Sequence, residues 1–459
     1  MTSHTEPPSE RNLGDRCGER MPHLLYVAWG FPPCRSGGVY RALATVNRFA
    51  ARGWRVTVLS ADRETFIRYT GSDTSLEHQV DPRVTVVRLP FVWPLREPDL
   101  RRWSRLRMER PRAWAKLRIY LDQLVFPEVG YGPWRRPLEA AAERIHRADP
   151  VDLVMSTANP HVAFTAGYRL WRRHGVPYVM DYRDAWLLDV FSGKRLHADN
   201  SRAGRWERRL VAGACEVWFV NDAIREWHAR LYPAHAPKMH TVSNGFDREL
   251  SRGFRQHEAE PDSPLSFGYV GTVSSKVPLA QFVEGWRRAR ECSTDLASAR
   301  AAIHGYLGFY ATPQPDLLNL FESAADARIS YEGPVSKGDI GRVYGTFDAL
   351  LLLLGAGRYV TSGKVFEYAA TGLPIVSVHD PDNATSDVLR DYPLWFPASS
   401  LEPEAIAQAL VRAAGAARTA ESRLRTRARS FGQRFSRDRQ LDPRIEALAH
   451  KVKQPLEIA

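Results

Sequence analysis

Short runs of apolar residues recur along the chain, and each is followed by a polar or glycine-bearing loop and then by an amphipathic stretch. One run, five consecutive leucines at residues 350–354, has the length and flanks of a strand that is buried on both faces. Such strands, alternating with helices, are typical of a parallel sheet that is covered by helices on both sides. The pattern therefore predicts an α/β protein. Further strands are expected at residues 23–28, 56–59, 151–156, 178–180, 216–220 and 266–270.

The alternation of strands and helices begins near residue 23 and again near residue 266. Together with the length of 459 residues, this predicts two domains. The polar, proline-bearing segment at 251–264 has the composition of a linker between them. We expect two Rossmann-like, doubly wound domains that face each other across a cleft, at residues 21–250 and 265–430. Residues 1–20 are expected to form a disordered tail, and residues 431–459 to form helices that pack back on the first domain.

The loop and helix that follow the leucine run predict an anion site. The loop at residues 355–363 contains several glycines, and the helix after it begins near Lys364. The free N–H groups of a first helical turn and the helix dipole both attract an anion. Lys364 and Glu367 share one face of this helix, so one can meet phosphate while the other accepts hydrogen bonds from hydroxyls. The sequence thus predicts a nucleotide-type ligand here.

A glycine pair precedes the first helix of the chain. Gly37 and Gly38 would let the backbone approach a phosphate or a sugar, although a plain tight turn explains them equally well. The pattern G-x-G-x-x-G is absent, so no dinucleotide site is predicted.

Three charged residues, Asp181, Arg183 and Asp184, follow the strand expected at 178–180. Charges at this point are costly in a core and natural in a cleft. One interpretation is a carboxylate that faces an acceptor hydroxyl. The alternative is an internal salt bridge of Arg183 with Asp181 or Asp184.

Basic residues are concentrated at 101–118 and 412–429 in a chain whose formal net charge is +12. Solvated helix faces explain them most simply. The first segment lies in an insertion at about 93–135, where one helical face carries apolar side chains. Either this helix covers the domain core, or it forms a basic aromatic surface for an anionic lipid or a lipid-linked acceptor. Single-stranded nucleic acid would use similar residues, but nothing else in the sequence supports it. The insertion holds Trp93, Trp103, Trp114 and Trp134, and the apolar face consists of Trp114, Leu117, Leu121 and Leu124.

Four scattered cysteines suit reduced thiols better than a disulfide framework or a zinc site. No run of about 18 uncharged apolar residues occurs, so no transmembrane helix is expected. We expect a cytoplasmic protein, with peripheral contact to the inner membrane face as an open alternative.

In their order, the motifs resemble those of a bacterial glycosyltransferase of family 4 with the GT-B fold, in the branch that carries D-x-R-D-x-W. That motif stands here as DYRDAW at residues 181–186. Supporting motifs cover nearly the whole chain: PPCRSGG at 32–38, FPEVGYGPW at 126–134, VSNGFD at 242–247, GYVGT at 268–272 and TSGKVFEYAATGLPIV at 361–376.

The resemblance implies a nucleotide-sugar-dependent hexosyltransferase. Such an enzyme moves a sugar from a nucleoside diphosphate sugar to an acceptor hydroxyl with retention, and it needs no obligatory metal or other cofactor. Its acceptor would be a small molecule, a glycan or a lipid-linked compound, in polysaccharide, glycolipid or natural-product biosynthesis.

The resemblance also implies roles for individual residues. Glu367 would bind the ribose, Lys364 would hold the diphosphate as it departs, and Asp184 and Asp181 would face the acceptor. The further donor-binding positions are Gly271, Thr272, Lys276, Tyr359, Ser362 and Gly363. The cleft positions on the acceptor side are Gly37, Gly38 and Arg183.

Two positions depart from the family pattern. Tyr359 stands where many members carry the first carboxylate of E-x7-E, which contacts the sugar, so donor specificity is expected to be set there. Many members also carry a histidine near the end of the strand that holds Asp181, where this chain has Arg183. The missing carboxylate supports one alternative, a non-catalytic protein of this fold that binds a sugar nucleotide or a partner. A remote alternative is a P-loop-like phosphotransferase, but Arg358 and Val365 occupy positions where that motif requires glycine and Ser or Thr.

Overall fold

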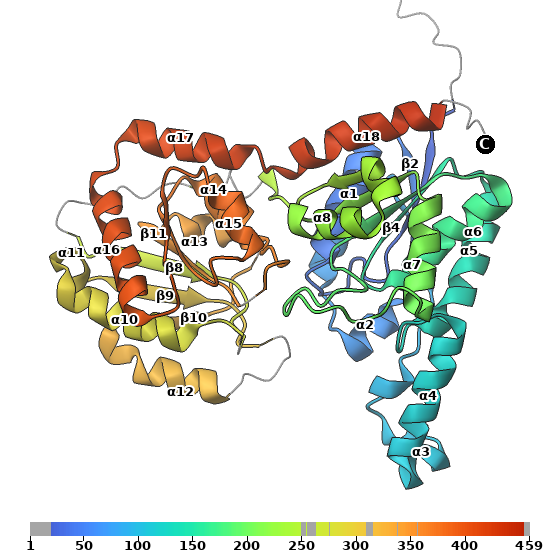
Figure 1. The fold of residues 1–459 in the computed structure, drawn as a ribbon, viewed down its shortest axis with the longest axis horizontal. Coiled ribbons are helices and arrows are strands. Elements are labelled where there is room, and N and C mark those ends of the chain that lie inside the picture. The colour runs from blue at the N-terminus through green and yellow to red at the C-terminus, as the bar shows by residue number, and fades with distance from the viewer. Residues whose placement is uncertain are drawn as a thin grey trace, which may run out of the picture.

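Two parallel β-sheets organise the chain, one in each half (Figure 1). The computed structural model describes residues 20–248, 254, 263–274, 276–308, 315–336, 338–355 and 357–453. The first sheet has the order β3-β2-β1-β4-β5-β6-β7 and the second the order β10-β9-β8-β11-β12-β13. In both sheets the strand order reverses beside the first strand, which is the doubly wound arrangement. The predicted α/β class with two Rossmann-like domains is confirmed. The expected tail, apart from Arg20, and most of the expected linker lie outside the described residues.

The strands are short and lie at regular intervals along the chain. Those of the first sheet are β1 (His23–Val27), β2 (Arg55–Ala61), β3 (Thr85–Leu89), β4 (Leu153–Thr157), β5 (Tyr178–Tyr182), β6 (Glu216–Phe219) and β7 (Met239–Thr241). Those of the second sheet are β8 (Ser266–Val270), β9 (Arg300–His304), β10 (Ile329–Gly333), β11 (Ala349–Leu353), β12 (Ile375–Val378) and β13 (Trp395–Pro397).

Helices connect these strands. In the first domain they are α1 (Val39–Ala51), α2 (Arg63–Tyr69), α3 (Arg105–Glu109), α4 (Pro111–Val125), α5 (Arg135–Ala148), α6 (Phe164–His174), α7 (Arg202–Gly213) and α8 (Asp222–Leu231). In the second they are α10 (Leu279–Cys292), α11 (Thr294–Ala297), α12 (Pro315–Ser323), α13 (Ile340–Tyr344), α14 (Lys364–Thr371), α15 (Ala384–Leu389), α16 (Pro403–Thr419) and α17 (Ser422–Gln433), after which comes α18 (Arg437–Lys453). Short 3-10 turns are η1 (Thr74–Gln79), η2 (Pro94–Arg96), η3 (Leu100–Arg102), η4 (Gly132–Trp134), η5 (His161–Ala163), η6 (Pro233–Lys238) and η7 (Ala325–Ala327).

The leucine run forms the centre of the second domain as β11. Its side chains alternate between two core clusters, with Leu351 and Leu353 on one face of the sheet and Leu350 and Leu352 on the other. Every residue of β11 is buried. A strand that faces helices on both sides has no polar side to present, which explains why the run is apolar throughout.

The chain crosses between the domains twice, after β7 and between α17 and α18 (Figure 1). The two crossings are hydrogen-bonded to each other: the N–H of Phe246 donates to the carbonyl of Phe435 at 3.1 Å, and that of Arg437 to the carbonyl of Phe246 at 3.0 Å. Helix α18 then packs on the first domain, where Glu216 accepts hydrogen bonds from Arg444 at 2.5 Å and Lys451 at 2.7 Å. Its buried residues Leu441, Ile445 and Leu448 join the core on the α1 side of the first sheet.

The predicted apolar helix of the insertion does not cover the domain core. Helices α3 and α4 extend away from the first domain (Figure 1), and Leu117, Leu121 and Leu124 are exposed. The interpretation of α4 as a covering helix is therefore wrong. Of the four tryptophans, Trp134 is buried in the core and Trp93 packs against it.

Two further features concern the described residues. Cys34, Cys215 and Cys292 are free thiols. No helix in the described part of the chain combines the length and the apolar character needed to cross a membrane.

A buried ion pair joins α1 to β5. Asp181 is completely buried and accepts hydrogen bonds from Arg41, with Nη2 at 2.6 Å from Oδ1 and Nε at 2.9 Å from Oδ2. Thr157 donates a further hydrogen bond to Oδ2 at 3.0 Å. The remaining N–H groups of Arg41 reach the carbonyls of Val242 at 2.9 Å and Ser243 at 3.2 Å. The buried carboxylate is thus fully paired, as its desolvation requires.

Replacing Arg41 by alanine is expected to destabilise the first domain by about 3–5 kcal/mol, because Asp181 would remain buried without its cation. Urea unfolding followed by tryptophan fluorescence measures the change. Arg55→Ala is the matched control, because its pair with Asp149 is partly exposed and such pairs contribute about 0–1 kcal/mol. Equal losses in the two variants would contradict this role for the buried pair. Arg41→Met combined with Asp181→Val should recover much of the stability.

Candidate active site

The loops at the carboxyl ends of the two sheets meet each other. Asn221, after β6, donates from Nδ2 to the carbonyl of Tyr359 at 2.9 Å and to the hydroxyl of Thr361 at 3.1 Å. The ammonium group of Lys276, after β8, lies 3.6 Å from the ring centre of Phe191. Ligands of open α/β sheets bind outside these strand ends. The contacts therefore place the candidate site between the two domains.

Lys364 and Gly271 form the centre of the site on the side of the second domain. A Cβ atom on Gly271 would lie 1.8 Å from Cε of Lys364, and Gly271 has a φ of +145° that disfavours other residues. The ammonium group of Lys364 donates to the hydroxyl of Tyr269 at 2.7 Å, and that hydroxyl donates to the carbonyl of Thr272 at 2.8 Å. The absence of a side chain at Gly271 thus lets the lysine lie across the loop that follows β8.

Glu367 lies one helical turn after Lys364 and is positioned by a buried tyrosine. The hydroxyl of Tyr344 donates to Oε2 of Glu367 at 2.8 Å. Burial, together with the negative charge of Glu367, raises the pKa of Tyr344 well above its usual value, so this phenol stays a donor. Oε1 accepts no hydrogen bond from the described residues, which leaves it available to ligand hydroxyls.

Glu367 lies within electrostatic range of a side chain of the first domain. The pKa of Tyr40, on α1, is raised by burial and by neighbouring groups that include Asp73, Tyr306 and Glu367. A carboxylate of the second domain thus acts electrostatically on a side chain of the first. This coupling agrees with a site that both domains line.

Gly38 and Arg183 meet on the side of the first domain. A Cβ atom on Gly38 would lie 1.3 Å from Nη1 of Arg183, so the guanidinium occupies the space that this glycine leaves. Arg183 donates to the carbonyls of Ala158 and, at 3.1 Å, Asn159. Open space surrounds Gly37. Close approach to Arg183, rather than a plain turn, therefore explains the glycine at position 38.

Asp184 is exposed and lies beside polar residues that the sequence analysis did not select. Asn159 donates from Nδ2 to Oδ2 of Asp184 at 2.9 Å. His161 stacks on Trp186 with ring centres 5.1 Å apart, and its Nδ1 lies 3.1 Å from Oε1 of Glu128. Asn159 and His161 directly follow β4, the neighbour of β5 in the sheet. Their position after a predicted strand was the signal that could have identified them.

Asp181 does not belong to this group. Its carboxylate points to the buried ion pair with Arg41, not into the space beside Asp184. The expectation that Asp181 faces an acceptor is corrected, because a fully buried carboxylate with three donors is not accessible to a ligand. The alternative, a salt bridge of Arg183 with Asp181 or Asp184, is wrong as well. Arg41 is the cation that pairs with Asp181, and Arg183 donates to main-chain carbonyls instead.

Three further predicted donor residues, Tyr359, Ser362 and Gly363, lie on the loop that leads into α14. Tyr359 packs against the core of the first domain, with its ring 3.5 Å from the position of a Cβ on Gly193. Gly363 is exposed at the start of α14, and the hydroxyl of Ser362 is 3.4 Å from the main-chain nitrogen of Lys364. The structure therefore gathers Gly271, Thr272, Lys364 and Glu367, and assigns Tyr359 to the domain contact.

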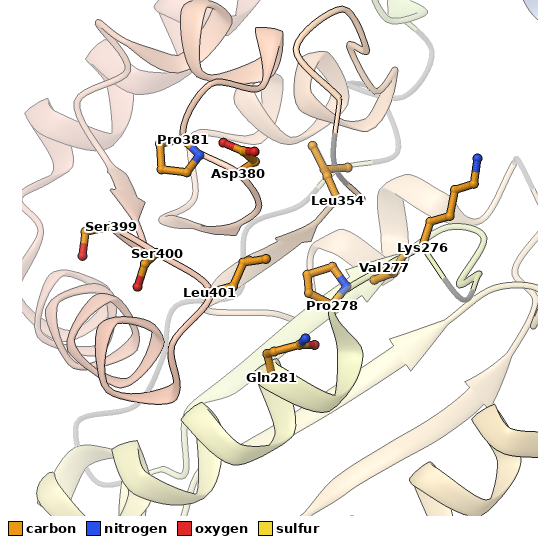
Figure 2. Close-up of a pocket in the computed structure, with 10 residues that line it drawn as sticks. All are labelled: Lys276, Val277, Pro278, Gln281, Leu354, Asp380, Pro381, Ser399, Ser400 and Leu401. Carbon is orange, nitrogen blue, oxygen red and sulfur yellow. The ribbon is translucent and has the colours of Figure 1, made fainter. Parts of the chain in front are cut away.

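A cavity of about 470 Å³ lies at the carboxyl ends of β11, β12 and β13. Leu354, Asp380, Ser399 and Gln281 contribute to its walls (Figure 2). Lys276 stands at the rim, and its side chain points away from Gln281 and Ser399 (Figure 2). The described residues contain no group of three or more His, Cys, Asp and Glu side chains that could hold a metal ion.

Comparison with known proteins agrees with this architecture. Residues 36–245 match the model of the glycosyl transferase 4-like domain. No curated protein sequence matches the chain.

Solved structures share the fold over nearly the whole chain. A glycosyltransferase from Rickettsia africae ESF-5 is 13% identical with a TM-score of 0.64, covering 95% of this chain and 100% of that one. A sucrose-phosphate synthase from Thermosynechococcus elongatus is 13% identical with a TM-score of 0.59, covering 94% and 99%. MnaA from S. aureus, in a structure with UDP, is 9% identical with a TM-score of 0.51, covering 94% and 97%.

The domain match includes Gly37, Gly38, Arg183 and Asp184, and it ends where the chain first crosses to the second domain. The fold likeness extends over both sheets. On these grounds the chain has the GT-B fold and carries a glycosyl transferase 4-like domain at residues 36–245.

Proposed function

We propose that the protein transfers a sugar from a nucleoside diphosphate sugar to an acceptor hydroxyl, with retention and without an obligatory metal ion. The contact of Lys364 with Gly271 carries this proposal. It joins a cation, a helix start and a glycine in the facing loop, which together allow a diphosphate to approach closely. MnaA, whose fold is similar, has been solved with UDP, which supports a nucleotide ligand for this fold.

The donor would lie along the first turn of α14. The diphosphate would meet Lys364 and the main chain at Gly363, while the ribose hydroxyls would donate to the carboxylate of Glu367. Tyr344 would hold that carboxylate in place from behind. Lys276 is a weaker candidate for the diphosphate, because its ammonium group already lies over the ring of Phe191.

The reaction would break the bond between the anomeric carbon and the diphosphate oxygen and form a bond from that carbon to the acceptor oxygen. Positive charge develops on the sugar, as in glycoside hydrolysis, and negative charge develops on the leaving diphosphate. Lys364 would stabilise the leaving group, so no metal ion is required in this proposal. Asp184, exposed beside Asn159, would face the acceptor and orient it by accepting a hydrogen bond from a group of the acceptor other than the reacting hydroxyl. The proton of that hydroxyl would pass to the departing phosphate oxygen, which balances the exchange.

One observation favours a second candidate, a protein that binds a sugar nucleotide without turnover. Position 359 carries a tyrosine that packs against the first domain, where the family resemblance implies a carboxylate that contacts the sugar. Slow hydrolysis of any donor in a panel of sugar nucleotides would decide against this candidate.

A screen of nucleoside diphosphates by thermal unfolding tests donor binding first. A ligand at about 100 times its Kd adds about 2.7 kcal/mol of stability, and the nucleotide that does so identifies the base. Transfer with the matching sugar nucleotide, followed by NMR of the anomeric proton, then tests retention. Inversion of the anomeric configuration would contradict the proposed stereochemistry, and undiminished turnover in a chelator supports independence from metal.

Lys364→Ala is expected to lower kcat by about 10²–10³, because one preorganised donor to the leaving group is lost. Steady-state kinetics with saturating donor measures the effect. Arg288→Ala, which removes a cation from the exposed surface of the same domain, is the control and should retain wild-type kcat. A Lys364 variant within a few-fold of wild type would rule out this role.

Glu367→Ala is expected to weaken nucleotide binding by about 10–100-fold, because hydrogen bonds to a charged group contribute about 1.5–3 kcal/mol. Titration calorimetry with the nucleoside diphosphate measures Kd. Tyr344→Phe keeps the carboxylate and removes only its positioning hydroxyl, so its effect should be smaller. An unchanged Kd in Glu367→Ala would contradict ribose binding at this residue.

A further inference from the structure

Residues 100–125, which comprise η3, α3 and α4, form an arm that stands out from the first domain (Figure 1). Helices α3 and α4 pack against each other. The arm is fixed at its base by Arg107, which is buried and donates to the carbonyls of Pro94 at 2.6 Å and Glu97 at 3.3 Å. The guanidinium lies 3.8 Å from the ring centre of Trp103 and 4.6 Å from that of Trp114. The arm is therefore a built element with its own internal contacts.

An apolar row runs along the outer face of α4. Leu117, Tyr120, Leu121 and Leu124 follow helical spacing and are 48%, 60%, 45% and 47% exposed. On α3, Leu106 and Met108 are exposed as well. Single exposed apolar residues are ordinary, but a continuous row on one helix face indicates a binding surface.

Positive charge accompanies this row. The arm holds eight Lys and Arg and two acidic residues, a net charge of +6, which is half the formal net charge of +12 of the whole chain. Its exposed cations Arg105, Arg110, Arg112 and Lys116 have no ion-pair partner among the described residues. By helical spacing Lys116 flanks the apolar row, and Arg112 lies one turn before it, further toward the polar face. The helix therefore carries cations next to its apolar side.

We propose that the arm docks on the surface of a membrane that contains anionic phospholipids. The leucine row enters the headgroup region, and Arg112 and Lys116 contact lipid phosphates. An amphipathic helix with cations beside its apolar face is the feature that such a surface binds. The charge of the arm argues against a second copy of this chain as the partner, because two such arms would repel each other.

The exposed residues also favour lipid over nucleic acid. Bases stack on aromatic faces, but the rings of Trp103 and Trp114 are occupied by Arg107. The outer row consists mainly of leucines, which offer neither stacking nor hydrogen bonds to bases. Docking needs no sugar transfer, so this proposal stands independently of the proposed function.

Co-sedimentation of the full-length protein with vesicles tests the proposal. Vesicles with about one third phosphatidylglycerol should bind the protein, and pure phosphatidylcholine vesicles should not. Arg112→Ala with Lys116→Ala should lower the partition coefficient by about 25-fold, which corresponds to about 1 kcal/mol for each lost cation near the surface. The control is Arg423→Ala with Arg427→Ala on α17, which removes the same charge from another exposed helix and should bind like wild type.

Leu117→Ser combined with Leu121→Ser and Leu124→Ser should lower binding at least about 10-fold while leaving the charge unchanged. Thermal unfolding with and without nucleotide verifies that each variant is folded, and the cation pair and its control remain informative if the leucine variant is not. Wild-type binding by the leucine variant, equal binding to both vesicle types, or equal loss in the α17 control would each overturn the proposal. So would a concentration-dependent dimer that the leucine variant abolishes, or capture by a single-stranded oligonucleotide without vesicle binding.

Discussion

The buried pair of Arg41 and Asp181 holds together the parts of the first domain that the site requires. A carboxylate that has lost its water needs a cation and hydrogen bonds, and Arg41 supplies both from α1. The same guanidinium bonds to Val242 and Ser243, where the chain leaves the first sheet for the second domain. Gly38 stands one turn before Arg41 and Arg183 stands two residues after Asp181. The ion pair thereby sets the contact of glycine and arginine that forms the wall of the cleft.

The fold was predictable because strands that are buried on both faces consist of apolar residues, which can be recognised in the sequence. A strand covered by helices on both faces has no polar side, so the leucines of β11 and the apolar residues of β1 indicated the parallel sheets without any knowledge of their partners. The glycine loop before α14 was equally visible, since helix starts and glycine turns are local features. The exact reason for Gly271 was not local. It depends on Lys364, which lies almost a hundred positions later in the chain.

The error over Asp181 came from one strand boundary. The strand was expected to end at residue 180, whereas β5 continues to Tyr182. Tyr178, Met180 and Tyr182 face one core cluster, and Val179 faces the other, on the α1 side. Asp181 lies two residues after Val179, on the same face of the strand, and so points towards α1, while Asp184 lies beyond the strand. The helical face of Trp114 and Leu117 was likewise inferred from spacing, but spacing alone does not tell whether another element covers that face.

The two chain crossings have a consequence for how the cleft can open. Phe246 exchanges main-chain hydrogen bonds with Phe435 and Arg437, so the outgoing and the returning segments run side by side as one paired strip. Two separate connections at distant points would lock the domains against rotation. With both crossings paired in one place, the two domains share a single axis of rotation. Helices α17 and α18 meet at this axis, and α17 packs on the second domain while α18 packs on the first. Any rotation of one sheet relative to the other would therefore bend the chain within this short paired segment.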